Sequence, residues 1–186
     1  MIQIVPYQSG WPDEFLSLGR QIRDVLGDRA VTIHHIGSTS VPGLSAKDVI
    51  DIQVSVAALE LSILADLASA GFVHGRLASD HCPPGVTLAE DELAKMMAGG
   101  PGRAAHIHIR VLGKFNRRYP LLCRDYLRSH RSAADAYGRV KQELARYFPD
   151  DVEAYYDIKD PVFDVLMAGA ADWAAQIGWV QPATDA

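Results

Sequence analysis

The fold of this chain is decided by residues 31–56, which read VTIHHIGSTSVPGLSAKDVIDIQVSV. The apolar and β-branched run over residues 31–36 predicts a buried strand that ends at Gly37. A second apolar run, residues 49–56, predicts another strand whose side chains alternate between two faces. Asp51 lies on this second strand. The pattern therefore indicates two strands joined by a loop, with polar groups gathered near the loop.

The loop that follows the first predicted strand has the composition of an anion-binding site. Backbone N–H groups lose their sheet partners where a strand ends, and they are then free to donate to an anion. Gly37 lets a phosphate approach the backbone closely, and the hydroxyls of Ser38, Thr39 and Ser40 add donors without adding charge. The alternative is an ordinary turn without a ligand.

Asp51 and Gln53 share one face of the second predicted strand. A carboxylate on an otherwise apolar strand is costly to bury unless it is paired or bound to a metal. Asp51 is therefore expected to ligate a divalent cation, and the alternative is that it caps the turn or pairs with Lys47. The combination of the glycine loop and the carboxylate at this spacing favours a phosphate-and-metal site.

These residues resemble the GrpB family of nucleotidyltransferase-fold proteins. The superfamily pattern pairs an apolar-Gly-Gly/Ser turn with a later Asp-apolar-Asp/Glu, which here read Ile36-Gly37-Ser38 and Asp51-Ile52-Gln53. The form particular to the family, close to H-x-G-S-T-x-V-P-G-L-x-A-K-x-x-I-D-I, matches from His35 to Ile52. Further matching segments are His106-Ile107-His108-Ile109, the Arg-Asp-Tyr-Leu-Arg core within residues 122–128, and Tyr156-x-x-Lys159.

The resemblance implies a nucleoside triphosphate as substrate or ligand, together with Mg²⁺ or Mn²⁺. It implies that Gly37, Ser38, Thr39, Lys47 and Lys159 bind the nucleotide, and that relatives fused to a dephospho-CoA kinase link the chain to coenzyme A metabolism. The expected catalytic residues are Asp51, Gln53 and His108. Gln53 stands where polymerase-like members carry a second acid, and a neutral amide is a poor substitute for a charged Mg²⁺ ligand.

His106 and His108 are two residues apart on a predicted strand, so their rings project from the same face. They could bind a metal together with Asp51, or they could be a hydrogen-bonded pair on the sheet surface. By resemblance, His108 takes the place of a third acid. Arg124 is followed by Asp125, which favours a structural ion pair, and His35 is a candidate brace for the loop.

The order of apolar patterns predicts an α/β (α+β) fold in which helices flank a small mixed sheet. We expect one domain over residues 1–180, with a sheet-containing core in 1–115, a helical subdomain in 116–180 and a frayed tail in 181–186. The remaining expected strands are 72–74 and 105–112. The expected helices are 11–26, 61–68, 117–130, 132–147 and 160–177, with a short helix at 93–97 inside a long, lid-like loop over 78–103.

The net charge of −5 argues against a protein whose main task is gripping nucleic acid. The two cysteines match no metal-ligand spacing and are too few for a disulfide framework, and neither a signal peptide nor a membrane span is visible, so a cytoplasmic location is expected. Three functions follow, in this order: metal-dependent nucleotidyl transfer to a small molecule, nucleotide binding without turnover, and metal-dependent hydrolysis on Asp51, His106 and His108.

Overall fold

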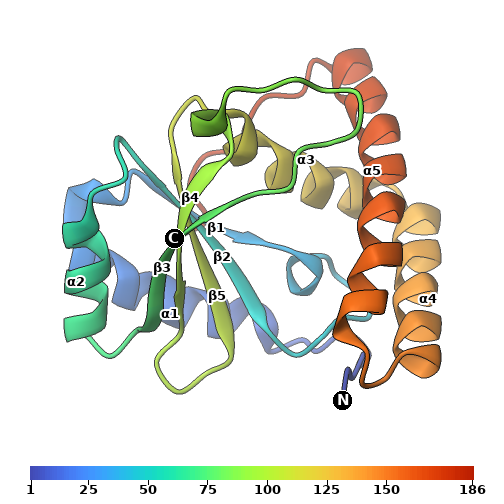
Figure 1. Ribbon diagram of the computed structural model, residues 1–186, viewed down its shortest axis with the longest axis horizontal. Coiled ribbons are helices and arrows are strands. Elements are labelled where there is room, and N and C mark those ends of the chain that lie inside the picture. The colour runs from blue at the N-terminus through green and yellow to red at the C-terminus, as the bar shows by residue number, and fades with distance from the viewer.

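The protein is described by a computed structural model that covers residues 1–186 and contains one five-stranded sheet (Figure 1). The strand order is β1-β2-β5-β4-β3; β2 and β5 run parallel, and the other neighbours are antiparallel. The strands are β1 Thr32–Ile36, β2 Ile50–Val56, β3 Val73–Ser79, β4 Ala94–Gly99 and β5 Ala105–Val111. The sheet is mixed, so the predicted fold class is confirmed.

Two groups of helices flank this sheet (Figure 1). The helices are α1 Trp11–Leu26, α2 Leu61–Ser69, α3 Phe115–Ser129, α4 Arg131–Tyr147 and α5 Val152–Ile177. Helices α1 and α2 share one hydrophobic core with the sheet, whereas α3, α4 and α5 form a second core with the loop that follows β1. No helix is both long and apolar enough to cross a bilayer.

Strand β2 separates the two cores because its side chains alternate. Its even-numbered apolar residues, such as Ile52, pack into the core that contains α1. On the opposite face, Arg117 of α3 donates from Nε to the Ser55 hydroxyl at 2.8 Å, and its carbonyl accepts from Gln53 Nε2 at 3.0 Å. The polar face of β2 is thus turned toward the helical layer.

The prediction of a short helix at residues 93–97 is wrong, because this segment is part of strand β4. Met96 and Ala98 alternate into the core, and β4 pairs with β3 on one side and β5 on the other. The predicted strand at 72–74 likewise extends to Ser79. A short apolar segment of this length is compatible with either a helix or a strand. Hydrogen bonds to two neighbouring strands make this one a strand.

The prediction that the last helix starts at Asp160 is also wrong. Helix α5 starts at Val152, where Asp151 caps it by accepting from the Ala154 amide at 2.9 Å, and Pro161 lies inside the helix. An Asp-Pro pair is a frequent helix start, but an earlier Asp already fills the capping position.

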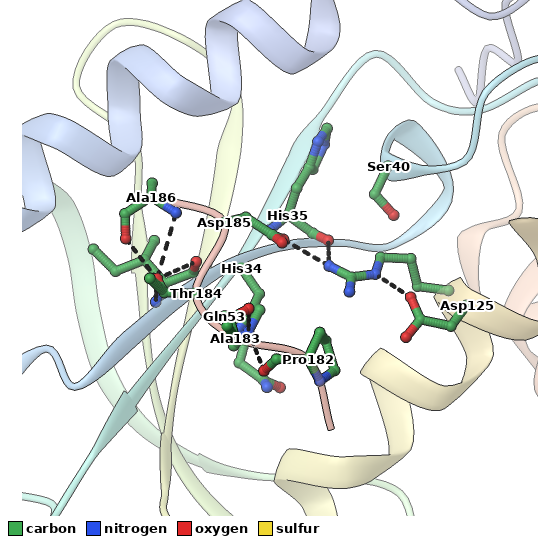
Figure 2. Close-up of polar contacts among 12 residues, drawn as sticks. His34, His35, Ser40, Gln53, Asp125, Pro182, Ala183, Thr184, Asp185 and Ala186 are labelled. Carbon is green, nitrogen blue, oxygen red and sulfur yellow. Dashed lines mark hydrogen bonds and ion pairs between the residues drawn. The ribbon is translucent and has the colours of Figure 1, made fainter. Parts of the chain in front are cut away.

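Residues 181–186 lie against β1 and do not fray (Figure 2). The Thr184 hydroxyl accepts from the Ile33 amide at 2.9 Å, and the Asp185 amide donates to the Ile33 carbonyl at 2.9 Å. His34 contributes a ring nitrogen 2.9 Å from the Ala183 carbonyl. This segment satisfies backbone groups on the outer edge of β1, which the sheet itself leaves unpaired.

Candidate functional site

A cavity of about 390 Å³ lies between the sheet and the helical layer. It is lined by residues of the loop after β1, of β2 and β5, and of all three C-terminal helices. Five cationic side chains and three carboxylates line it: Lys47, Arg110, Arg124, Lys141 and Lys159, and Asp51, Asp80 and Asp160. The cavity lining carries excess positive charge although the whole chain has a net charge of −5, so it suits an anion.

The predicted anion-binding loop forms one wall of this cavity. Gly37 has φ 69° and ψ −173°, a conformation that is essentially confined to glycine. A Cβ atom at this position would collide with the carboxylate of Asp51. Ser38–Ser40 then form a 3-10 turn, and the Ser40 hydroxyl donates to the Gly37 carbonyl at 2.6 Å. The loop backbone therefore lies directly against the one carboxylate that the sequence pattern selects.

Side chains from β1 and α3 hold the loop in this position. A ring nitrogen of His35 lies 3.0 Å from the Thr39 hydroxyl, which leaves Thr39 in a bracing role. Arg128 donates twice to the Ser40 carbonyl, from Nε at 2.9 Å and from Nη2 at 2.7 Å. Burial lowers the pKa of His35 to about 4, so its ring is neutral near pH 7. The bracing role proposed for His35 agrees with this geometry.

Arg124 is structural as well as cavity-lining. Its Nε atom pairs with Asp125 at 2.8 Å, as the sequence suggested, and its Nη1 atom donates to the His35 carbonyl at 3.0 Å and to Asp185 at 2.6 Å (Figure 2). Arg124 thereby ties helix α3 to the end of β1 and to the C-terminal segment.

Asp51, His106 and His108 meet at the floor of the cavity, where β2 pairs with β5. The Nδ1 atom of His106 lies 3.1 Å from Asp51 Oδ1, and the Nε2 atom of His108 lies 3.6 Å from the same oxygen. One potential ligand atom from each residue lies within 4.8 Å of the others. Burial alone would raise the pKa of Asp51, but hydrogen bonds from the two imidazoles outweigh burial, so its pKa lies below the usual range.

The two histidines differ in their fitness as metal ligands. The Nδ1 atom of His108 accepts from Arg110 Nη2 at 3.3 Å and lies 3.4 Å from Lys95 Nζ, so the ring proton must sit on Nε2, which faces Asp51. A metal-binding imidazole instead donates its other N–H to an acceptor. No cation donates a hydrogen bond to His106, whose side chain is 55% exposed and contacts Asp51. Asp51 and His106 therefore fit a divalent ion, whereas His108 is arranged as a hydrogen-bond donor.

Gln53 is not brought to the cavity. It is completely buried, its Nε2 atom donates to the Arg117 carbonyl, and its Oε1 atom accepts from Arg110 Nη1 at 2.8 Å. Gln53 shares the strand face of Asp51, but α3 covers it, so its amide takes part in a structural network. Gln53 therefore offers no ligand to the cavity, and Asp51 is the one residue of β2 that lines it.

Lys47 and Lys159, which the resemblance assigns to the nucleotide, both line the cavity. Lys47 Nζ lies 4.5 Å from the ring centre of Tyr155, and Lys159 Nζ lies 5.0 Å from that of Tyr156. Lys47 donates to the Tyr156 hydroxyl at 3.3 Å, and the ion-pair alternative in which it binds Asp51 is not observed. These contacts place flexible cations beside aromatic faces at the cavity wall.

Lys141 is a cavity residue that the sequence analysis missed. It is only 3% exposed, and Nζ donates to the Ser38 hydroxyl and to the Ser45 carbonyl, both at 2.7 Å. Its signal in the sequence is its position on the buried stripe of α4, three residues after Gly138 and three before Leu144. A lysine on an apolar helix stripe, like Asp51 on an apolar strand, is costly to bury unless it has a partner, so it indicates a candidate site residue.

The sequence profile described as "GrpB protein" matches residues 1–168. The chain belongs to the GrpB family. The crystal structure of conserved protein GrpB from Enterococcus faecalis superimposes with a TM-score of 0.73 at 27% identity, covering 91% of this chain and 98% of that chain.

This GrpB protein is also similar to two proteins of different size. It is 29% identical over 195 residues to a dephospho-CoA kinase of Mycolicibacterium paratuberculosis, covering 96% of this chain but 48% of the relative, so the chain spans about half of that relative. The structure of the GLD-2/RNP-8 complex has a TM-score of 0.54 at 12% identity, covering 84% of this chain and 50% of that chain. The predicted nucleotidyltransferase-like fold is thus confirmed.

Proposed function

We propose that this GrpB protein binds a nucleoside triphosphate with a divalent metal ion in the cavity and transfers its nucleotidyl group to a small acceptor. The observation that carries the proposal is the contact between the Gly37 backbone and the Asp51 carboxylate. Because of it, a phosphate on the loop and a cation on Asp51 would be immediate neighbours. The positive lining of the cavity supports an anionic ligand of this kind.

Each residue has a specific task in this proposal. Ser38 donates to a phosphate oxygen, and Lys47 and Lys159 offset the negative charge of the triphosphate and of the departing pyrophosphate. The metal, when bound, neutralises charge on the phosphates as a Lewis acid. Asp51 and His106 would hold it, and a donor set that contains imidazole favours Mn²⁺ over Mg²⁺, which prefers oxygen ligands.

The first test is nucleotide binding by Ser38→Ala, measured by calorimetric titration. Loss of one hydroxyl removes a donor but no core atom, so affinity for a triphosphate should fall about threefold to tenfold. The free protein should stay folded, with a somewhat lower melting temperature because buried Lys141 loses one hydrogen-bond acceptor. Equal affinity in the variant and the wild type would show that Ser38 contributes nothing to phosphate binding.

The second test addresses the metal through Asp51→Asn. Mn²⁺ should raise the melting temperature of the wild type, because a ligand that binds only the folded state stabilises it, and the variant should lose this response. A variant with an unchanged Mn²⁺ response would place the ion elsewhere. Circular dichroism confirms that both proteins are folded at the start of the melts.

Catalysis itself requires a third measurement. An α-labelled nucleoside triphosphate, Mn²⁺ and a panel of small hydroxyl or phosphate acceptors should yield a labelled acceptor together with pyrophosphate. The dephospho-CoA kinase relative supports including coenzyme A precursors in the panel.

Nucleotide binding without turnover is the second candidate, and the burial of Gln53 favours it. Two-metal transfer relies on several carboxylates, and only Asp51 lines the cavity from β2. Tight, metal-dependent binding without labelled product on any acceptor would favour this candidate. A metal-dependent hydrolase that uses both histidines is disfavoured by the proton that Arg110 and Lys95 fix on His108 Nε2.

A further inference from the structure

The Ser38 hydroxyl and the Lys141 ammonium form an isolated pair within the cavity. The 2.7 Å contact with Lys141 is the only hydrogen bond of the Ser38 hydroxyl, and a second 2.7 Å bond, to the Ser45 carbonyl, orients the Lys141 nitrogen. A nucleophile within hydrogen-bond reach of a base that a third group orients is the general arrangement of an activated hydroxyl. The neighbouring Ser40 lacks it, because its hydroxyl donates to the Gly37 carbonyl.

The surroundings of Lys141 favour its neutral form. Burial, together with the charge of Lys159 on α5, lowers its pKa to about 7, although Cys123 on α3 and Asp51 on β2 act in the opposite direction. The ring of Tyr137, on the same helix, lies 4.7 Å from Nζ. A neutral amine can donate one N–H to the Ser45 carbonyl while its lone pair accepts the proton of Ser38.

We propose that Ser38 is a nucleophile toward phosphorus electrophiles bound in the cavity, with Lys141 as its general base. The assignment of a phosphorus electrophile rests on the proposed function, because a cavity lined by cations attracts the anionic phosphates of a nucleoside triphosphate. With Ser38 as nucleophile, nucleotidyl transfer takes two steps and passes through a covalent nucleotidyl-Ser38 intermediate. The alternative route is direct attack by the acceptor in one step.

In the first step, Ser38 Oγ forms a bond to the α-phosphorus, the bond from that phosphorus to the bridging oxygen breaks, the Ser38 proton passes to Lys141 Nζ, and pyrophosphate leaves. In the second step, an acceptor hydroxyl attacks the same phosphorus and loses its proton to water. The bond between phosphorus and Ser38 breaks, and Lys141 returns the proton to Oγ.

The experiment labels the whole protein with an alkyl fluorophosphonate, which reports an activated serine without any nucleotide. Mass spectrometry of the digested protein should find the adduct on Ser38 and none on Ser40. The labelling rate should rise with pH through about 7, as Lys141 loses its proton. Lys141→Arg keeps the charge but cannot accept a proton, so it should slow labelling roughly hundredfold or more.

The proposal is overturned by an absence of the Ser38 adduct at every pH from 6 to 9, or by a labelling rate in Lys141→Arg that equals that of the wild type. The pH profile of the wild type decides the question even if Lys141→Arg is poorly folded, because a flat profile contradicts a base with a pKa near 7. Ser38→Ala provides the unlabelled control.

The labelling assay and the nucleotide assays can fail independently. Nucleotide-dependent transfer without an adduct on Ser38 would retain the proposed function and reject the covalent route. An adduct without any nucleotide binding would retain the activated serine and reject the proposed function. If both hold, incubation with an α-labelled triphosphate should leave the label on Ser38 before an acceptor is added.

Discussion

Gly37 connects the backbone conformation of the loop to the chemistry of Asp51. Its φ of 69° disfavours any residue with a side chain, and the space where a Cβ would stand is filled by the Asp51 carboxylate. A glycine that merely turned the chain would need only the positive φ. The contact with the Asp51 carboxylate is an additional constraint, and it ties the loop to the proposed metal ligand.

We predict that Gly37→Ala destabilises the protein by about 1–3 kcal/mol, because a side chain is strained at this φ and must also displace Asp51. The variant should also lose most of the Mn²⁺ response in thermal melts. Gly27→Ala is the matched control, since Gly27 has φ 55° and ψ −135° but nothing within 4 Å of its would-be Cβ. If both variants respond equally to Mn²⁺, the Gly37 contact does not shape the metal site.

At the scale of elements, the C-terminal segment supports the loop indirectly. Asp185 accepts from the His35 amide at 3.0 Å and from Arg124 at 2.6 Å (Figure 2). Arg124 in turn holds the His35 carbonyl, and His35 contacts Thr39 in the loop. Strand β1, helix α3 and the segment 181–186 are therefore joined through one buried guanidinium.

Removal of the Asp185 carboxylate should weaken this junction. We predict that Asp185→Ala lowers the free energy of unfolding by about 1–3 kcal/mol, because the Arg124 guanidinium stays buried and loses a partner. Amide hydrogen exchange should speed up over residues 35–40. Asp157→Ala, at an exposed position on α5, serves as the control and should change stability by less than about 0.5 kcal/mol. If amide hydrogen exchange over residues 35–40 is unchanged in Asp185→Ala, the C-terminal segment does not support the loop.

At the scale of the whole molecule, the histidines control how stability depends on pH. Burial lowers the pKa of both His35 and His108 to about 4, whereas the hydrogen bond to Asp51 raises the pKa of the half-exposed His106. Between pH 4 and about 6.5, the unfolded chain therefore binds more protons at His35 and His108 than the folded chain does. Folding stability must rise with pH across this interval.

We predict a loss of roughly 3 kcal/mol of stability for each of these two histidines as pH falls from about 6.5 to 4. Asp51 adds to the loss below about pH 4, because its folded pKa is lowered. His106 acts in the opposite sense: its contribution is complete below about 6.5 and is lost as pH rises through its raised pKa. Urea unfolding at a series of pH values measures the slope, and His35→Gln should flatten it. An unchanged slope in that variant would contradict a neutral, buried His35.

The sequence by itself determined the glycine loop, Asp51 and the histidine pair. These features depend on strand alternation and on glycine chemistry, which operate within a few residues of chain. Helix α1 was predictable for the same reason, since its apolar residues recur at helical spacing and it ends at Gly27. The start of α5 and the identity of β4 were not, because local signals there favoured another start and another kind of element.

Only the tertiary structure decided which polar groups meet. Gln53 has the same strand face as Asp51, yet α3 covers it and leaves Asp51 at the cavity. Lys141 is 103 residues from Ser38 in sequence, and the tail is 150 residues from His35. The side chains that surround a carboxylate or a serine set its charge and its reactivity, and the packing of distant helices brings those side chains together. A local pattern can therefore select a reactive residue, but the packed fold determines what that residue can do.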